Sequence, residues 1–190
     1  MRKIWILAVS FLVFLLSLSS LSVKAYAITE DISASSSSKA EINYELPYPG
    51  LLPDNPLYFL RAVRDRIVSF LIADPKKKAE FNLLQADKRL NAGIYLLNSN
   101  PNEKKINLAI STISKGENYF EEALERVREA GRQGMDVSDI IGRLKDSSRK
   151  HQEEVAKLSQ KSAQNFKASF ENQQRRAANF ETEAESLTSK

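Results

Sequence analysis

Proline is kept out of every long apolar repeat in this chain, and this constrains the fold more than any other feature. Four of the six prolines fall between Pro47 and Pro56, in the stretch LPYPGLLPDNPLYFL. Proline fixes φ and biases the residue before it toward extended backbone, so residues 46–53 are predicted not to be helical. Asp54 and Asn55 are good N-cap residues, and a proline suits the first helical position. The stretch is therefore expected to lead into a helical domain.

The same helix-start chemistry recurs at Asp74-Pro75 and, more loosely, at Asn100-Pro101-Asn102. Between these breaks apolar residues recur at steps of three and four, which is typical of helices. The expected helices cover about 56–72, 75–98 and 103–130, and a fourth runs from about 137 nearly to the end. The chain is thus predicted to be all-α, a small antiparallel bundle of four helices. The first helix should carry one apolar face, formed by Leu60, Val63, Ile67, Phe70 and Leu71.

The fourth helix is predicted to be unusually long, because no glycine or proline interrupts residues 143–190. At 1.5 Å per residue, a rod of about 75 Å would overhang the other helices. Its C-terminal part has polar flanks and a thin apolar stripe that includes Phe166, Phe170, Phe180 and Leu187. Three interpretations stay open: a solvated helical tail, a surface for self-association or a protein partner, and folding back on the bundle.

The N-terminus predicts export. Met1–Lys3 is basic, Ile4–Leu16 is almost wholly apolar, and Ala25-Tyr26-Ala27 forms a cleavage site, as in a secretory signal peptide. The alternative is an uncleaved anchor, since Ile4–Val23 is about long enough to span a bilayer. The protein is expected in the periplasm, at the cell surface or outside the cell. Contact with the membrane is expected only in transit through the signal peptide, or through the anchor.

The domain organisation follows from these patterns. We expect a signal peptide at 1–27, a serine-rich flexible linker at 28–45, a helical bundle at 46–158 and a polar helical extension at 159–190.

Composition excludes several partners and chemistries. Without Arg2, Lys3 and Lys24, 25 basic residues face 24 acidic ones, so nucleic acid is not an expected partner. The absence of cysteine excludes disulfides, metal-thiolate sites and cysteine nucleophiles.

His151 is the only histidine, which excludes histidine-rich metal sites and the H-E-x-x-H motif. It lies in line with Leu144, Val155 and Leu158, which favours a hydrogen-bonded histidine in the bundle wall. Half of a proton relay, or a weak metal pair, with Glu154 is the alternative. No nucleophile elbow or phosphate-binding glycine loop is present. No catalytic, cofactor-binding or metal-binding residues are predicted, and we expect no enzyme.

A weaker hypothesis places a ligand or anion contact at Tyr58, Arg61, Arg64 and His151. An ordinary pair between Arg61 and Asp65, four residues apart on one helix, is the simpler interpretation. The run 76–78 of three lysines is expected to form a solvated face, with anionic lipid or wall polymer as the alternative.

Several motifs resemble a family of exported bacterial proteins known only as a domain of unknown function. The opening PG-x-LPD-x-P-x-Y-x-L is present at 49–60, D-P-x-x-K-A-E at 74–80 and A-x-x-R-L at 86–90. A later segment is similar around Lys150-His151, but Glu154 stands where an aliphatic residue is expected. The resemblance covers about 46–158 and implies an all-helical domain outside the cytoplasm. It implies no activity.

We therefore expect a non-enzymatic interaction or structural module of the bacterial cell envelope, binding a protein partner or itself through the C-terminal helix. The alternative is an extracytoplasmic sensor or ligand-binding domain with a pocket near Tyr58, Arg61 and His151.

Overall fold

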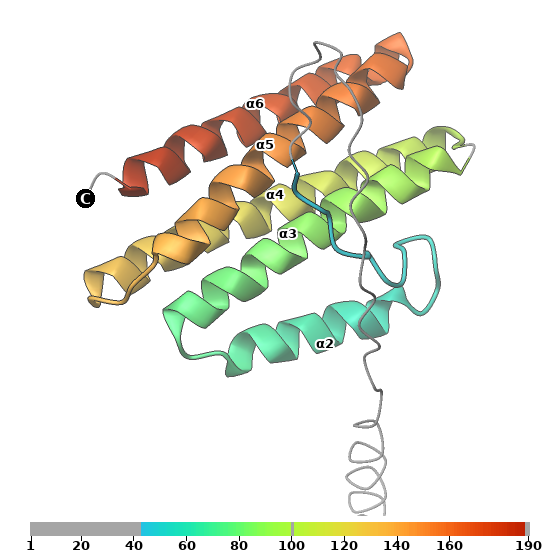
Figure 1. Ribbon diagram of the computed structural model, residues 1–190. Coiled ribbons are helices and arrows are strands. Elements are labelled where there is room, and N and C mark those ends of the chain that lie inside the picture. The colour runs from blue at the N-terminus through green and yellow to red at the C-terminus, as the bar shows by residue number, and fades with distance from the viewer. Residues whose placement is uncertain (1–42, 100, 189–190) are drawn as a thin grey trace, which may run out of the picture. The chain divides into compact units, whose positions relative to one another are not determined.

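The computed structural model describes residues 43–99 and 101–188 of the chain (Figure 1). The predicted signal peptide and nearly all of the predicted linker lie outside these residues. The described part forms five α-helices: α2 (Tyr58–Leu71), α3 (Pro75–Asn98), α4 (Glu103–Arg132), α5 (Ser138–Lys161) and α6 (Gln164–Thr188). Helices are the only regular secondary structure of these residues, which confirms the all-α class. None of the described helices combines the length and apolarity needed to cross a membrane.

Two of the predicted helix starts are confirmed in detail. The Asp74 side chain accepts a hydrogen bond from the Lys77 backbone N–H, and Pro75 is the first residue of α3. At the start of α4, Asn102 accepts from the Lys105 N–H. The predicted start of the first helix at Pro56 is two residues too early, because Asn55 caps only the turn before Tyr58, through the Leu57 N–H.

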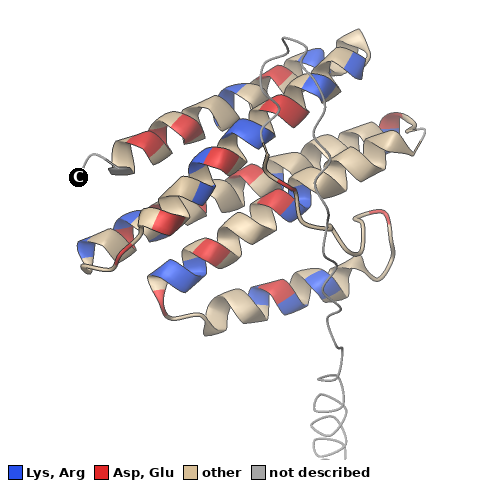
Figure 2. Cartoon of the chain, in the orientation of Figure 1, with Lys and Arg blue, Asp and Glu red and all other residues tan. Residues whose placement is uncertain are grey.

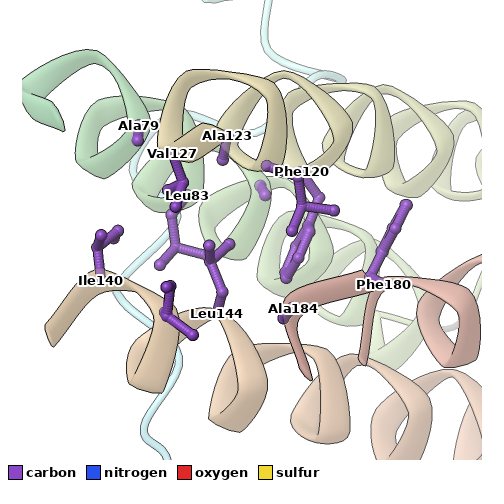
Figure 3. Packing of buried hydrophobic residues seen from close by; sticks show 12 residues of the cluster. Ala79, Leu83, Phe120, Ala123, Val127, Ile140, Leu144, Phe180 and Ala184 are labelled. Atoms are coloured by element: carbon purple, nitrogen blue, oxygen red, sulfur yellow. The ribbon is translucent and has the colours of Figure 1, made fainter. Parts of the chain in front are cut away.

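The core is built by α3, α4, α5 and α6. One apolar cluster lies around Phe120, Leu144 and Phe180, and most of its members are shown in Figure 3. A second cluster, farther along the helices, lies around Leu90, Ile113 and Phe170. Burial of these side chains is the main favourable contribution to the fold.

A layer of buried polar side chains separates the two clusters. Each of the four helices contributes one member between its cluster residues: Asp87, Glu117, His151 and Gln173. His151 Nε2 lies 3.1 Å from Asp87 Oδ1. The side-chain amide of Gln173 is oriented with its nitrogen toward the Glu117 carboxylate, to which it donates, because this orientation satisfies both groups. We call these four residues the polar layer.

The predicted single C-terminal rod is wrong. Ser162 adopts an extended conformation between α5 and α6, and α6 turns back along α5 (Figure 1). Glu181 of α6 accepts from Arg149 Nε at 2.6 Å and from Gln152 at 2.8 Å. The reversal buries the phenylalanines of α6, which a straight helix would leave in water. Of the three interpretations, folding back is the one observed.

Residues 43–57, which we call the strap, lie against α3 before α2 begins. The Tyr44 hydroxyl donates to Asp87 Oδ2 at 2.6 Å, and the Asn91 side chain donates to the Pro47 carbonyl at 3.0 Å. Gly50 has φ +72°, a conformation that favours glycine, and turns the strap toward α2. The lead-in role predicted for the proline-rich stretch agrees with this arrangement.

Candidate functional site

Helix α2 presents its apolar side chains to solvent. It lies at the edge of the bundle in Figure 1, and the side chain of Phe70 is 86% exposed. At 3.6 residues per turn its outward apolar residues fall within an arc of about 120°, the width of a core-facing stripe. We call this the apolar face of α2; it consists of Phe59, Leu60, Val63, Ile67, Phe70 and Leu71, all of them exposed. Such a contiguous exposed apolar face is unusual on the surface of a soluble domain.

The side of α2 that meets the bundle is polar. Asp65 is only 3% exposed, and Arg61 is buried beside it, with 3.7 Å between Arg61 Nε and Asp65 Oδ2. Arg61 Nη1 also donates to the strap carbonyls of Pro49 and Leu51. These contacts fix the rotation of α2 about its axis. If its apolar face turned toward the bundle, Arg61 and Asp65 would lose their buried partners.

The edges of the apolar face carry positive charge. Arg66 and Arg64 lie on opposite sides of the apolar arc, and both are exposed. Arg64 donates to Asp65 Oδ1 at 2.7 Å, so the only carboxylate of α2 is held on the inner side. In Figure 2, α3 to α6 carry charges of both signs, whereas the exposed charges of α2 are all cationic.

Electrostatics around α2 agree with this cationic character. Burial lowers the pKa of the Arg61 guanidinium. Burial also lowers the pKa of Lys88 on α3, and the charges of Arg61 and Arg64 add to that effect. Lys88 therefore lies in a field dominated by the arginines of α2, and one carboxylate, Asp65, opposes them.

The predicted ligand contact is divided between two environments. Tyr58, Arg61 and Arg64 lie together on α2, where the Tyr58 hydroxyl accepts from Arg89 Nη1 at 2.7 Å. His151 lies elsewhere, in the polar layer, with its ring edge-on to Phe120 at 5.5 Å between centroids. Tyr58 and Arg61 contact Arg89 and the strap, whereas His151 contacts Asp87 and Phe120.

The predicted partner-binding residues of the C-terminal helix face inward. Phe166, Phe170 and Phe180 are 8%, 0% and 2% exposed, and Leu187 packs against the cluster of Phe180. The expectation that they form an exposed binding surface is wrong, because α6 folds back and uses them as core.

Burial perturbs the ionisation of Glu117 in the polar layer and of Tyr44 beside it. Burial raises the pKa of Glu117 to about 8, and the charge of Glu121 acts in the same direction. Arg176 Nη1, 2.8 Å from the Glu117 carboxylate, opposes this effect. Burial raises the pKa of the Tyr44 phenol above its ordinary value, and the charge of Asp87 acts in the same direction. Ser147 Oγ donates to Asp87 Oδ1 at 2.5 Å, so Asp87 accepts from the strap and from α5.

This arrangement lacks the geometry of a nucleophile, base and orienting acid. Ser147 and His151 both contact Asp87, so the histidine does not stand between the serine and the carboxylate. Both side chains are buried. Among residues 43–99 and 101–188, no group of three or more His, Asp or Glu side chains is placed to hold a metal ion.

Sequence reasoning identified the apolar periodicity of α2 but not the direction of its apolar face. The available signal was charge: Arg61 and Asp65, spaced to pair, occupy the side of the helix opposite to that face. Asp87 and Glu117 were missed altogether, because each sits among charged neighbours in the sequence and only the packing shows that it is buried.

A family model described as a domain of unknown function (DUF5667) matches residues 50–165, well over half of the chain. The match covers α2 to α5 and the turn before α6. No curated protein and no solved structure matches this chain.

Proposed function

The chain belongs to the DUF5667 family, whose function is unknown, and we propose from its geometry that it is a non-enzymatic interaction module of the bacterial cell envelope. The observation that carries this proposal is the apolar face of α2. In the described part of the chain this face stays exposed, and its rotation is fixed by buried polar contacts on the opposite side.

Two further features support a binding role over a catalytic one. Three side chains of types found in catalytic sites contact one another in a buried hydrogen-bonded network: Asp87, Ser147 and His151. The exposed apolar face, in contrast, lies on a separate helix at the edge of the bundle. A partner can cover α2 without disturbing the core of α3 to α6.

The proposed localisation in the cell envelope depends on the predicted signal peptide at 1–27. Export would place the compact unit of residues 40–190 outside the cytoplasm, where the membrane, the wall polymer and other envelope proteins are the available partners. The alternative, a sensor or ligand-binding domain, has less support, because Tyr58 and Arg61 contact Arg89 and the strap, whereas His151 contacts Asp87.

The test is sedimentation of the chain from Ile28 onward with an isolated bacterial envelope fraction. We expect the natural chain to pellet and the variant Val63→Ser/Ile67→Ser/Phe70→Ser to stay in the supernatant. Leu84→Ser is the matched control, because Leu84 is an exposed leucine on α3, and it should pellet like the natural chain. Circular dichroism should show equal helix content and unchanged melting for all three proteins. Equal pelleting of the triple variant would contradict the proposal.

A further inference from the structure

Helix α2 has the properties of a helix that lies flat on a membrane. Its 14 residues span about 21 Å, too short to cross the roughly 30 Å of bilayer hydrocarbon. Its apolar face contains two phenylalanines, two leucines, a valine and an isoleucine, all exposed. An amphipathic helix of this kind binds with its apolar face in the acyl boundary and its cations among the headgroups.

The charges beside the apolar face of α2 indicate which kind of membrane surface it would bind. Arg64 and Arg66 lie on either side of the apolar face, at the level of lipid phosphates when that face is buried. Arg64 also pairs with the buried Asp65 at 2.7 Å, but its side chain is still 63% exposed. Asp65 is buried against the bundle and does not face the surface. A cationic border with no exposed carboxylate is complementary to anionic lipid, and each such cation adds to the attraction.

The same charges disfavour a second copy as the occupant. Two copies joined by a twofold axis would use the same face, so Arg64 and Arg66 of each would border one shared interface. Helix α2 exposes no carboxylate that could pair with them.

We infer that α2 docks on an anionic phospholipid surface, with its apolar face in the acyl boundary and Arg64 and Arg66 on the phosphates. This inference rests on the proposed interaction role of α2 and names its partner. It differs from the expectation that the chain meets the membrane only through its signal peptide or anchor. It also leaves the bundle of α3 to α6 outside the bilayer, where its surface of mixed charge remains hydrated.

The first experiment measures binding to vesicles by sedimentation, again with the chain from Ile28, which contains the whole compact unit but not the apolar segment Ile4–Leu16. We expect binding to vesicles of phosphatidylcholine with phosphatidylglycerol, weak binding to phosphatidylcholine alone, and weakening by added salt. Arg64→Gln/Arg66→Gln should bind about tenfold more weakly. Lys104→Gln/Lys115→Gln removes the same charge from exposed positions of α4 and should bind like the natural chain.

The second experiment reports where α2 lies. The single tryptophan, Trp5, precedes Ile28, so Phe70→Trp gives the shortened chain one fluorophore on the apolar face. Its emission should shift to shorter wavelength when the anionic vesicles are added. Leu84→Trp on α3 is the control and should show no shift.

The outcomes separate this inference from the proposed function. Binding to the envelope fraction without binding to anionic vesicles would overturn the lipid inference and leave the interaction role standing. Loss of both would overturn both. A dimer seen by light scattering without lipid, and abolished by the triple serine variant, would assign the apolar face of α2 to a second copy and overturn the inference.

Discussion

Asp87 of α3 and His151 of α5 meet at 3.1 Å, between Oδ1 and Nε2, although 64 residues separate them in the chain. Asp87 also accepts from Tyr44 of the strap and from Ser147 of α5. One carboxylate thus joins the strap and two helices between the two apolar clusters. A polar contact of this kind fixes the register of helices, because a shifted arrangement leaves buried groups without partners.

Replacement of Asp87 by alanine should destabilise the fold strongly. The change removes the polar partner of the buried Ser147 and His151 and of the half-buried Tyr44. We expect a loss of about 3 kcal/mol or more in the free energy of unfolding. Urea denaturation followed by circular dichroism measures it. Asp146→Ala, at an exposed position of α5, is the control and should change the value by less than about 0.5 kcal/mol. A small loss for Asp87→Ala would contradict the register role.

The stability contribution of Glu117 should depend on pH. Its pKa of about 8 lies above the ordinary 4.5, so the folded chain retains a proton that the unfolded chain releases. The stabilisation is complete below about pH 4.5 and is lost as the pH rises through about 8. Relative to the natural chain, Glu117→Gln should therefore gain stability between pH 5 and pH 8, by at most about 5 kcal/mol.

Urea unfolding at several pH values measures this gain. Glu121→Gln changes a half-exposed partner of the same Arg176 and should show little pH dependence of its effect. A Glu117→Gln effect that is constant with pH would show that Glu117 is ionised in the folded chain throughout the range.

Two glycines should respond to alanine in opposite directions. A Cβ at Gly116 of α4 would lie 3.0 Å from the Ala86 carbonyl and from Arg89 Cβ on α3, so Gly116→Ala should cost about 1–3 kcal/mol. Gly142 of α5 has nothing within 4 Å of such a Cβ, so Gly142→Ala should stabilise by about 0.5–1 kcal/mol through helix propensity. Thermal melting of both variants checks the pair; stabilisation by both would mean that α3 and α4 do not pack closely at Gly116.

Removal of α6 should destroy the bundle. A chain that ends at Lys161 loses Phe166, Phe170 and Phe180 from the core and uncovers their partners on α4 and α5. We expect uncooperative melting and binding of hydrophobic dyes. A cooperative transition near that of the longer chain would instead support the boundary at residue 158 that the sequence suggested.

The helices and their starts could be predicted from the sequence because they depend on neighbours in the chain. Asp74 and Asn102 cap by contacts three residues away, and the apolar period of α3 and α4 is local. The reversal of the chain at Ser162 could not be predicted, because no glycine or proline marks it. It is driven by the burial of phenylalanines against helices that are distant in sequence.

In the candidate site, too, the features that depend on one helix could be predicted, and those that depend on packing could not. Tyr58, Arg61 and Arg64 were expected together because they share one helix. That their neighbours Val63 and Ile67 point into solvent was not expected. An apolar period defines one face of a helix but does not show whether another element packs on that face. Tertiary packing alone decides that question, and here it places the buried pair Arg61–Asp65 on the inner side.

The polar attachment of α2 has a consequence for the dynamics of the chain. Releasing α2 breaks hydrogen bonds of Arg61 and Tyr58 but exposes neither apolar cluster, since the members of both clusters belong to α3, α4, α5 and α6. Its opening therefore requires less free energy than global unfolding, and its amides should exchange with deuterium well before those of α3. We therefore expect α2 to open as a local unit when these hydrogen bonds break, while α3 to α6 stay folded.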